Sequence, residues 1–262
     1  MDNFFEKYEL EAINEYKKNG YIIRDIEEKE SLIWIKDFFN SKIKSYLSID
    51  EIDLNFIHEK ISLKNLNDFR LKLINDMQSE KLFRYHYYKI SKKFLDIIVG
   101  NELVMQKSIN LSIQLPYDDS SLLPIHADVW SGDSPFEVVA WLPLVNCYAS
   151  KSMYLLPPKH SEELINNFDE FSGKSSSEIF EKVKDKVEWL EIDFGKILIF
   201  DQSLPHGNIT NIVNETRWSM NCRFKSIYSP YGDKKLGEFF QPITLKPASE
   251  IGMKYNLPNI KN

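Results

Sequence analysis

Apolar residues recur at helical spacing through the first hundred positions of the chain. This spacing predicts helices over residues 2–18 and 29–47, because side chains three or four positions apart share one face of a helix. Gly20 is a typical helix stop, and the apolar run at 21–23 predicts a short strand. Residues 50–100 also read mostly as helix. The first part of the chain is therefore expected to be helical.

Beyond residue 100 the pattern changes to short apolar runs separated by prolines and other turn residues. The clearest runs are SINLSIQL, FEVVAWLPLV, SMYLLP, KILIF and RWSMNCRF. Such runs predict the short strands of an all-β sandwich or barrel. A polar segment at 161–187 interrupts them and reads as a helical insertion. The expected organisation is one domain over 1–262, with a mainly helical part at 1–100, a β-core at 101–228 and an irregular tail at 229–262.

Composition narrows the functional classes. The formal net charge is -6 and the pI is about 5.5, so the surface does not favour nucleic acid or an anionic membrane. The N-terminus is charged throughout and lacks the apolar stretch of a signal peptide, and no run reaches the roughly 18 apolar residues of a membrane span. Cys147 and Cys222 are too few for a disulfide framework. These features predict a cytoplasmic protein with a small-molecule substrate, and they leave monomer and homodimer open.

Two histidines and one aspartate stand at positions typical of a metal site. His126 and Asp128 flank a single residue, so an extended chain would point both side chains to the same side. His206 follows closely on the predicted strand KILIF. Two imidazoles and one carboxylate on one face of a metal form the facial triad of non-haem Fe(II) oxygenases, which leaves coordination sites open. His160 is a competing ligand, but its place after two prolines reads better as a structural histidine that closes a loop.

Arg217 stands eleven positions after His206, at the start of the run RWSMNCRF. Its guanidinium is a planar fork that can bind a carboxylate through two hydrogen bonds. Arg217, Ser219, Asn221 and Arg223 alternate along this run and are expected on one face of a strand. A buried face with two arginines is costly unless it meets an anion, and a dicarboxylate co-substrate would be such an anion.

Other roles for these polar residues remain open. Arg217 could instead form a surface ion pair with Glu215, although such pairs contribute only about 0–1 kcal/mol. Arg223 could be a second anion contact, a substrate-pocket residue or a structural residue. Gln114, on the strand before the HxD segment, could reach the co-substrate, and a plain sheet role is the alternative.

These residues together carry a family resemblance. The ordered set of His126, Asp128, a strand opened by Gly195, His206 and Arg217 resembles the Fe(II)/2-oxoglutarate-dependent dioxygenases. The resemblance covers most of residues 20–225.

Within that superfamily the chain is most similar to the phytanoyl-CoA hydroxylase-type branch. Residues 19–23 resemble its opening strand, and residues 151–160 resemble its strand and turn with the pattern NG-x-L-x-x-x-PGSH. Lys151-Ser152 replaces the usual Asn-Gly and Pro158-Lys159 replaces the usual Gly-Ser, which argues against a close acyl-CoA hydroxylase. Residues 126–139 are similar to oxygenases of bacterial carbohydrate biosynthesis clusters.

The resemblance implies a fold, a set of cofactors and a reaction. The implied fold is α+β and mainly β: a double-stranded β-helix (jelly roll, cupin-like) with the N-terminal helices packed on one sheet. His126, Asp128 and His206 would hold Fe(II), Arg217 would bind the far carboxylate of 2-oxoglutarate, and O2 would be the oxidant. The expected reaction hydroxylates a substrate C–H bond and yields succinate and CO2. Asp128 favours hydroxylation over halogenation, because the related iron halogenases lack this carboxylate.

The substrate is the least constrained part of the prediction. Trp130, Ser131 and Asp133 follow the HxD segment and could border a sugar ring, or they could form a packed turn. Lys151 could meet an anionic substrate group, or it could be an exposed lysine. The first hypothesis is a sugar, nucleotide sugar or glycoconjugate precursor. An acyl thioester, lipid or amino acid is the second, and a non-redox jelly-roll sugar-binding or isomerase protein is the third. A lectin has no need of Arg217 together with the triad.

Overall fold

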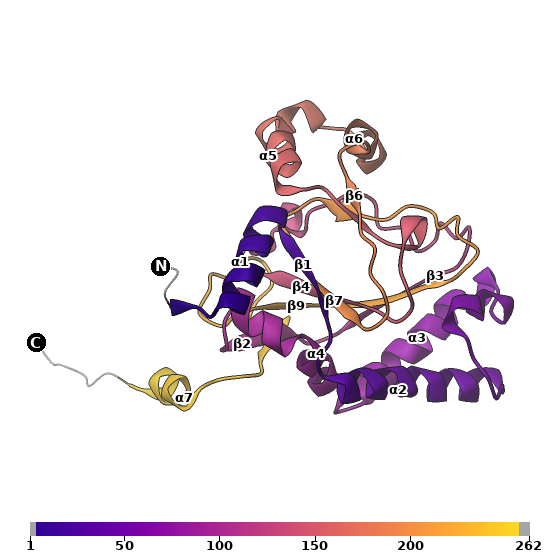
Figure 1. Cartoon of the computed structure of the whole chain (residues 1–262), viewed down its shortest axis with the longest axis horizontal. Helices are drawn as coiled ribbons and strands as arrows, with labels where there is room; N and C mark the ends of the chain where they lie inside the picture. Colours follow the sequence, from indigo (N-terminus) through magenta and orange to yellow (C-terminus); the bar gives the residue numbers. More distant parts are fainter. Residues whose placement is uncertain (1–3, 257–262) are drawn as a thin grey trace, which may run out of the picture.

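The computed structural model describes residues 4–256, which form helices around two antiparallel sheets (Figure 1). The large sheet has seven strands in the order β1-β7-β4-β9-β2-β10, with β3 also pairing with β9. Its strands are β1 (Tyr21–Asp25), β2 (Leu103–Gln106), β3 (Asn110–Gln114), β4 (Val138–Pro143), β7 (Lys196–Asp201), β9 (Arg217–Ser226) and β10 (Phe240–Pro242). Sequence neighbours are rarely sheet neighbours, which is the connectivity expected of a jelly roll.

The small sheet has the strand order β6-β5-β8. Its strands are β5 (Tyr154–Leu155), β6 (Glu188–Trp189) and β8 (His206–Gly207). An isolated antiparallel bridge between His126 and His206 extends this sheet beyond β8. The small sheet therefore ends at two of the predicted metal ligands.

Four N-terminal helices pack on one face of the large sheet, as predicted. They are α1 (Lys7–Asn19), α2 (Lys29–Leu47), α3 (Leu63–Ser79) and α4 (Phe83–Ile98). Figure 1 shows α2, α3 and α4 below the large sheet and α5 and α6 above the small one. The first helix begins later than predicted, where Glu6 and Glu9 form a capping box, and it ends at Gly20 with φ of 76°. Shorter 3-10 helices include η2 (Leu54–Glu59), η3 (Asp128–Ser131), η4 (Ala149–Lys151) and η5 (Phe168–Phe171).

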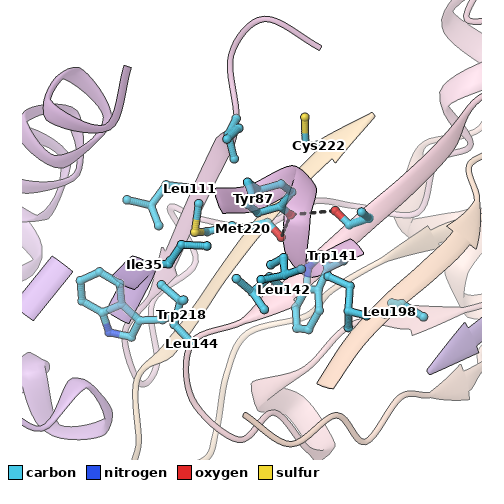
Figure 2. Packing of buried hydrophobic residues seen from close by; sticks show 14 of the residues in the cluster. Ile35, Tyr87, Leu111, Trp141, Leu142, Leu144, Leu198, Trp218, Met220 and Cys222 are labelled. Carbon is cyan, nitrogen blue, oxygen red and sulfur yellow. Dashed lines mark hydrogen bonds between the residues drawn. The ribbon is translucent and has the colours of Figure 1, made fainter. Parts of the chain in front are cut away.

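Strand β9 separates the helix-side core from the interior of the β-sandwich. Trp218, Met220 and Cys222 are fully buried and belong to the same hydrophobic cluster as the helices (Figure 2). The hydroxyl of Tyr87 on α4 lies 2.9 Å from the carbonyl oxygen of Ala140 on β4, which ties the helices to the sheet. The other set of residues along β9, which begins with Arg217, points to the opposite face of the sheet, because side chains alternate along a strand.

Two regions differ in detail from the sequence predictions. The helical insertion at 161–187 is present as α5 (Pro158–Asn166), η5 and α6 (Ser176–Val183). It begins earlier than predicted because Pro158 occupies the first turn of α5, where its missing N–H costs nothing. The tail at 229–262 is not wholly irregular. It contributes the edge strand β10, which pairs with β2, and the helix α7 (Pro247–Lys254). The prediction of an irregular tail rested on its prolines, but Pro242 ends an edge strand and Pro247 starts a helix.

Helices in residues 4–256 are too short or too polar to cross a lipid bilayer. The two cysteines, Cys147 and Cys222, are buried and unpaired.

Candidate metal centre and cavity

The bridge between His126 and His206 sets the two imidazoles side by side. The two residues exchange both backbone hydrogen bonds, with N to O distances of 3.0 and 2.8 Å. Their ring centroids lie 4.4 Å apart. Directly opposed residues in an antiparallel pair project to the same side, so one short backbone contact aligns both rings.

Each imidazole is oriented by the carbonyl two residues before it. Nδ1 of His126 lies 2.8 Å from the oxygen of Pro124, and Nδ1 of His206 lies 2.8 Å from the oxygen of Leu204. A carbonyl can only accept a hydrogen bond, so Nδ1 carries the hydrogen in both rings. Nε2 is then the lone-pair nitrogen in both, which is the tautomer that metal binding through Nε2 requires.

Asp128 completes the cluster. Its backbone N–H donates to the carbonyl of Gln202 at 3.1 Å, which holds the HxD segment against the chain leading to His206. Nε2 of His126 lies 3.6 Å from Oδ1 of Asp128. The ligand atoms of His126, Asp128 and His206 all lie within 4.8 Å of one another, and within residues 4–256 no other group of His, Cys, Asp or Glu has this arrangement. The three residues can hold one divalent cation on one face.

Burial keeps His206 in the form that binds a metal. Burial, followed by the neighbouring His126, lowers the pKa of His206 to about 3. The imidazole is therefore neutral at neutral pH, and its lone pair is available.

Arg223 links Asp128 to a second carboxylate. Its Nη2 lies 3.0 Å from Oδ1 of Asp128, and its Nη1 donates to Oδ2 of Asp133 at 2.5 Å. Asp133 is buried, and the ring of Phe239 lies 5.6 Å from the Arg223 guanidinium. Arg223 therefore holds the carboxylate of Asp128 in place and is itself neutralised, so its charge is not free for a co-substrate. This favours the structural reading among those that the sequence left open.

Arg217 has quite different surroundings. Its Nη1 donates to the carbonyl of Ser152 and its Nη2 to the hydroxyl of Ser112, both at 3.1 Å. It is 5% exposed, its Nε has no hydrogen-bond partner, and no acidic side chain of residues 4–256 lies within ion-pair distance. Burial lowers the pKa of Arg217 to about 10, which leaves the guanidinium charged at neutral pH. A buried, unneutralised cation of this kind favours an anionic ligand.

One cavity of about 370 Å³ connects the triad with Arg217. The four alternating residues of β9, Arg217, Ser219, Asn221 and Arg223, all line it, as their parity predicted. Val139 on β4 pairs with both Phe200 and Arg223, so three adjacent strands form its floor. Its other lining residues are Arg70, Asn110, Leu111, Ser112, Ser120, Ser121, Leu122, Leu123, His126, Asp128, Trp141, Met153, His206, Gly207 and Asn208.

Several residues predicted to contact ligands lie outside the cavity wall. The side-chain amide of Gln114 donates to the carbonyl of Ile209 at 2.9 Å, so Gln114 has a sheet-and-loop role. Trp130 packs against Phe168 with ring centroids 5.1 Å apart, and the hydroxyl of Ser131 donates to the carbonyl of Asp128. These two side chains support the metal loop instead of lining the pocket.

Lys151 is neither a cavity residue nor an exposed lysine. It is fully buried, and its Nζ lies 2.5 Å from Oε2 of Glu215 and 2.6 Å from Oδ1 of Asn55. Glu215 neutralises Lys151, so Glu215 is not the partner of Arg217. His160 lies in the first turn of α5 and pairs with Glu163 at 3.0 Å, away from the triad cluster.

Sequence reasoning missed the contribution of the N-terminal helices to the cavity. Arg70 on α3 lines the same cavity as the triad. No motif marks it, because its position depends on how α3 packs beside β3. Asn208, two residues after His206, was also missed, although its closeness to the metal segment was a usable signal.

Solved structures share this fold. The nickel complex of the non-haem monooxygenase ThoJ matches with a TM-score of 0.53 and 13% identity, over 91% of this chain and 85% of that one. HygX from Streptomyces hygroscopicus, solved with nickel and 2-oxoglutarate bound, matches with a TM-score of 0.52 and 8% identity, over 88% and 90% of the two chains. EctD from S. alaskensis matches with a TM-score of 0.54 and 11% identity, over 87% and 79%.

At these identities the likeness establishes the architecture: the chain has the jelly-roll fold of the non-haem, 2-oxoglutarate-dependent oxygenases. No protein-family model matches the sequence, and no curated protein sequence matches it. The phytanoyl-CoA hydroxylase-type branch therefore stays a prediction.

Proposed function

We propose that this protein is an Fe(II)- and 2-oxoglutarate-dependent oxygenase. His126, Asp128 and His206 would bind the iron through the two Nε2 atoms and one carboxylate oxygen. Arg217 would bind the distal carboxylate of 2-oxoglutarate. The bound metal and co-substrate would supply electrons that activate dioxygen, and dioxygen would supply the oxidising power for attack on a C–H bond.

One observation carries the proposal: the unneutralised guanidinium of Arg217 lines the same cavity as the triad. A metal site alone would fit many functions. A metal site that shares a cavity with a buried cation fits a co-substrate that chelates the metal at one end and carries a carboxylate at the other. HygX, which has the same fold, was solved with nickel and 2-oxoglutarate bound.

The chain's own residues would divide the work between them. The carbonyls of Pro124 and Leu204 orient the two imidazoles, and Arg223 orients Asp128. Phe200 packs edge-on against His206 with ring centroids 4.9 Å apart, and with Val139 and Trp141 it provides an apolar wall that limits water near the metal. Ser112 and Ser152 hold the guanidinium of Arg217 in a fixed orientation.

Hydroxylation of a small polar substrate, namely a sugar, nucleotide sugar or glycoconjugate precursor, is the proposed reaction. The cavity rim carries amide and hydroxyl side chains from Asn110, Ser120, Ser121 and Asn221, which suit a ligand rich in hydroxyl groups. The same chemistry on an acyl thioester, lipid or amino acid is the alternative.

Anaerobic calorimetry with Fe(II) and 2-oxoglutarate tests the cofactors. We expect 2-oxoglutarate to bind only when the metal is present, and succinate to form slowly on addition of O2 even without substrate. A product heavier than its substrate by one oxygen atom would establish hydroxylation. Binding of only zinc or calcium, with no affinity for 2-oxoglutarate, would contradict the proposal and favour a non-redox sugar-binding or isomerase protein.

A further inference from the structure

The cavity is lined by a third guanidinium, that of Arg70 on α3. Its Nη1 lies 3.3 Å from the hydroxyl of Ser121, and its Nη2 lies 2.9 Å from the side-chain oxygen of Asn67. Both acceptors are neutral, and no ion pair of Arg70 occurs within residues 4–256. A guanidinium has five N–H donors, so most of the donor capacity of Arg70 remains for a ligand.

The three cavity arginines therefore differ in how their charge is balanced. Arg223 has two carboxylate partners, Asp128 and Asp133. Arg217 has none and is enclosed, which suits the proposed co-substrate. Arg70 also has none but is only partly buried, so it lies where a second ligand can approach. One co-substrate accounts for one unneutralised cation, and the other is left for the substrate.

The loop at 120–123 connects Arg70 to the segment that carries the metal-site residue His206. Ser121 accepts from Arg70, and the carbonyl of Ser121 accepts from the side-chain amide of Asn208. The backbone N–H of Leu123 donates to the other side-chain atom of Asn208, its Oδ1, at 2.5 Å. Asn208 lies two residues after His206, so the rim that carries Arg70 has a fixed position relative to the metal centre.

We infer that Arg70 forms an anion-recognition subsite at the cavity rim and that the substrate carries a phosphate or carboxylate group. This inference rests on the proposed function. Among the substrate classes considered above, it selects a sugar phosphate, nucleotide sugar or sugar acid over a neutral sugar. Asn110 and Asn221, hydrogen-bonded to each other at 2.8 Å on adjacent strands, lie on the same cavity wall and would meet the hydroxyl groups of such a substrate.

Calorimetric titration of the Mn(II)-loaded protein at saturating 2-oxoglutarate tests the subsite. The probes are glucose 6-phosphate, glucuronate and glucose. We expect at least one charged probe to bind more tightly than glucose, and Arg70→Gln to weaken its binding about tenfold or more, since a charged hydrogen-bonding group is lost. Arg70→Lys keeps the charge and should lose less. Binding of glucose 6-phosphate alone would identify a phosphate, and binding of glucuronate alone a carboxylate.

Two control variants separate recognition from structure. Lys64→Gln removes a positive charge from an exposed position of α3. Its affinity for the charged probe should equal that of the wild-type protein. Asn67→Ala removes the other neutral acceptor of Arg70, lies outside the cavity lining and keeps the guanidinium. A merely structural Arg70 would give the same loss in Asn67→Ala as in Arg70→Gln, and that result would overturn the inference.

The inference and the proposed function can fail separately. Charged probes that bind no better than glucose, or equally well to Arg70→Gln, overturn the inference even when 2-oxoglutarate binds normally. Absence of 2-oxoglutarate binding overturns the proposed function. In that case the anion subsite still stands if Arg70→Gln alone loses the charged probe.

Discussion

Arg217 and Arg223 lie on the same face of β9, six residues apart, but only Arg223 has acidic partners. An extended strand of that length spans roughly 20 Å, so the two guanidinium groups belong to different ends of the strand. At the Arg223 end, charge is balanced inside the protein by Asp128 and Asp133. At the Arg217 end it is not, and one buried donor lacks an acceptor.

The comparison teaches that residue type and parity are not enough to assign a role to a buried arginine. Both arginines fit the sequence pattern for anion contacts. Arg223, which is neutralised, holds the carboxylate of a candidate metal ligand. Arg217, which is not neutralised, is free to bind an anionic ligand. Variants of the two ends should therefore change different measurements.

The largest effect is expected at the metal itself. His206→Ala removes one of two imidazole ligands, so Fe(II) binding in anaerobic calorimetry should fall below detection and succinate release should stop. His160→Ala is the matched control, because His160 pairs with Glu163 outside the triad. Equal metal binding by both variants would rule out the proposed ligand set.

Arg217→Gln should weaken 2-oxoglutarate binding about 10- to 100-fold, because the charged partner of the distal carboxylate is lost. Metal affinity should not change, since Arg217 has no contact with the triad. Titration of the Mn(II)-loaded variant with 2-oxoglutarate measures this. If the affinity for metal falls and the affinity for 2-oxoglutarate does not, the roles assigned to Arg217 and Arg223 are wrong.

Arg223→Gln should have the opposite profile. It leaves Asp133 buried without its partner and frees Asp128, so we expect a loss of roughly 2–4 kcal/mol in the free energy of unfolding and about tenfold weaker metal binding. Urea denaturation and metal titration measure the two quantities. A variant that loses only 2-oxoglutarate affinity would show that Arg223 is an anion contact after all.

The smallest expected effect is a difference in pH dependence. The folded pKa of His206 is about 3, below the ordinary value of roughly 6.5, so protonation favours the unfolded chain. The metal-free protein should lose up to about 1.4 kcal/mol of stability per pH unit as pH falls below about 6.5. This slope should shrink in His206→Gln and stay the same in Arg217→Gln. Denaturation series between pH 7 and pH 4 compare the three proteins.

The sequence predicted the parts of the site that depend on local spacing. His126 and Asp128 are two apart, and the four alternating residues of β9 share a strand face, so their common orientation follows from backbone geometry alone. Prediction from the sequence failed for residues whose contacts come from distant segments of the chain. Lys151 is neutralised by Glu215 and held by Asn55, and Gln114 is held by Ile209. Spacing along the chain carries no information about such partners.

By itself the sequence determined the order and type of most elements and the three residues that form the candidate metal centre. Periodicity and short motifs specify which side of an element a residue occupies. Only the tertiary structure decided that Arg217 is a buried cation without an acid, that Arg223 is neutralised, and that Arg70 on a distant helix lines the same cavity. The physical reason is that burial and charge balance are properties of everything around a side chain, and those surroundings exist only once the helices have packed on the sheet.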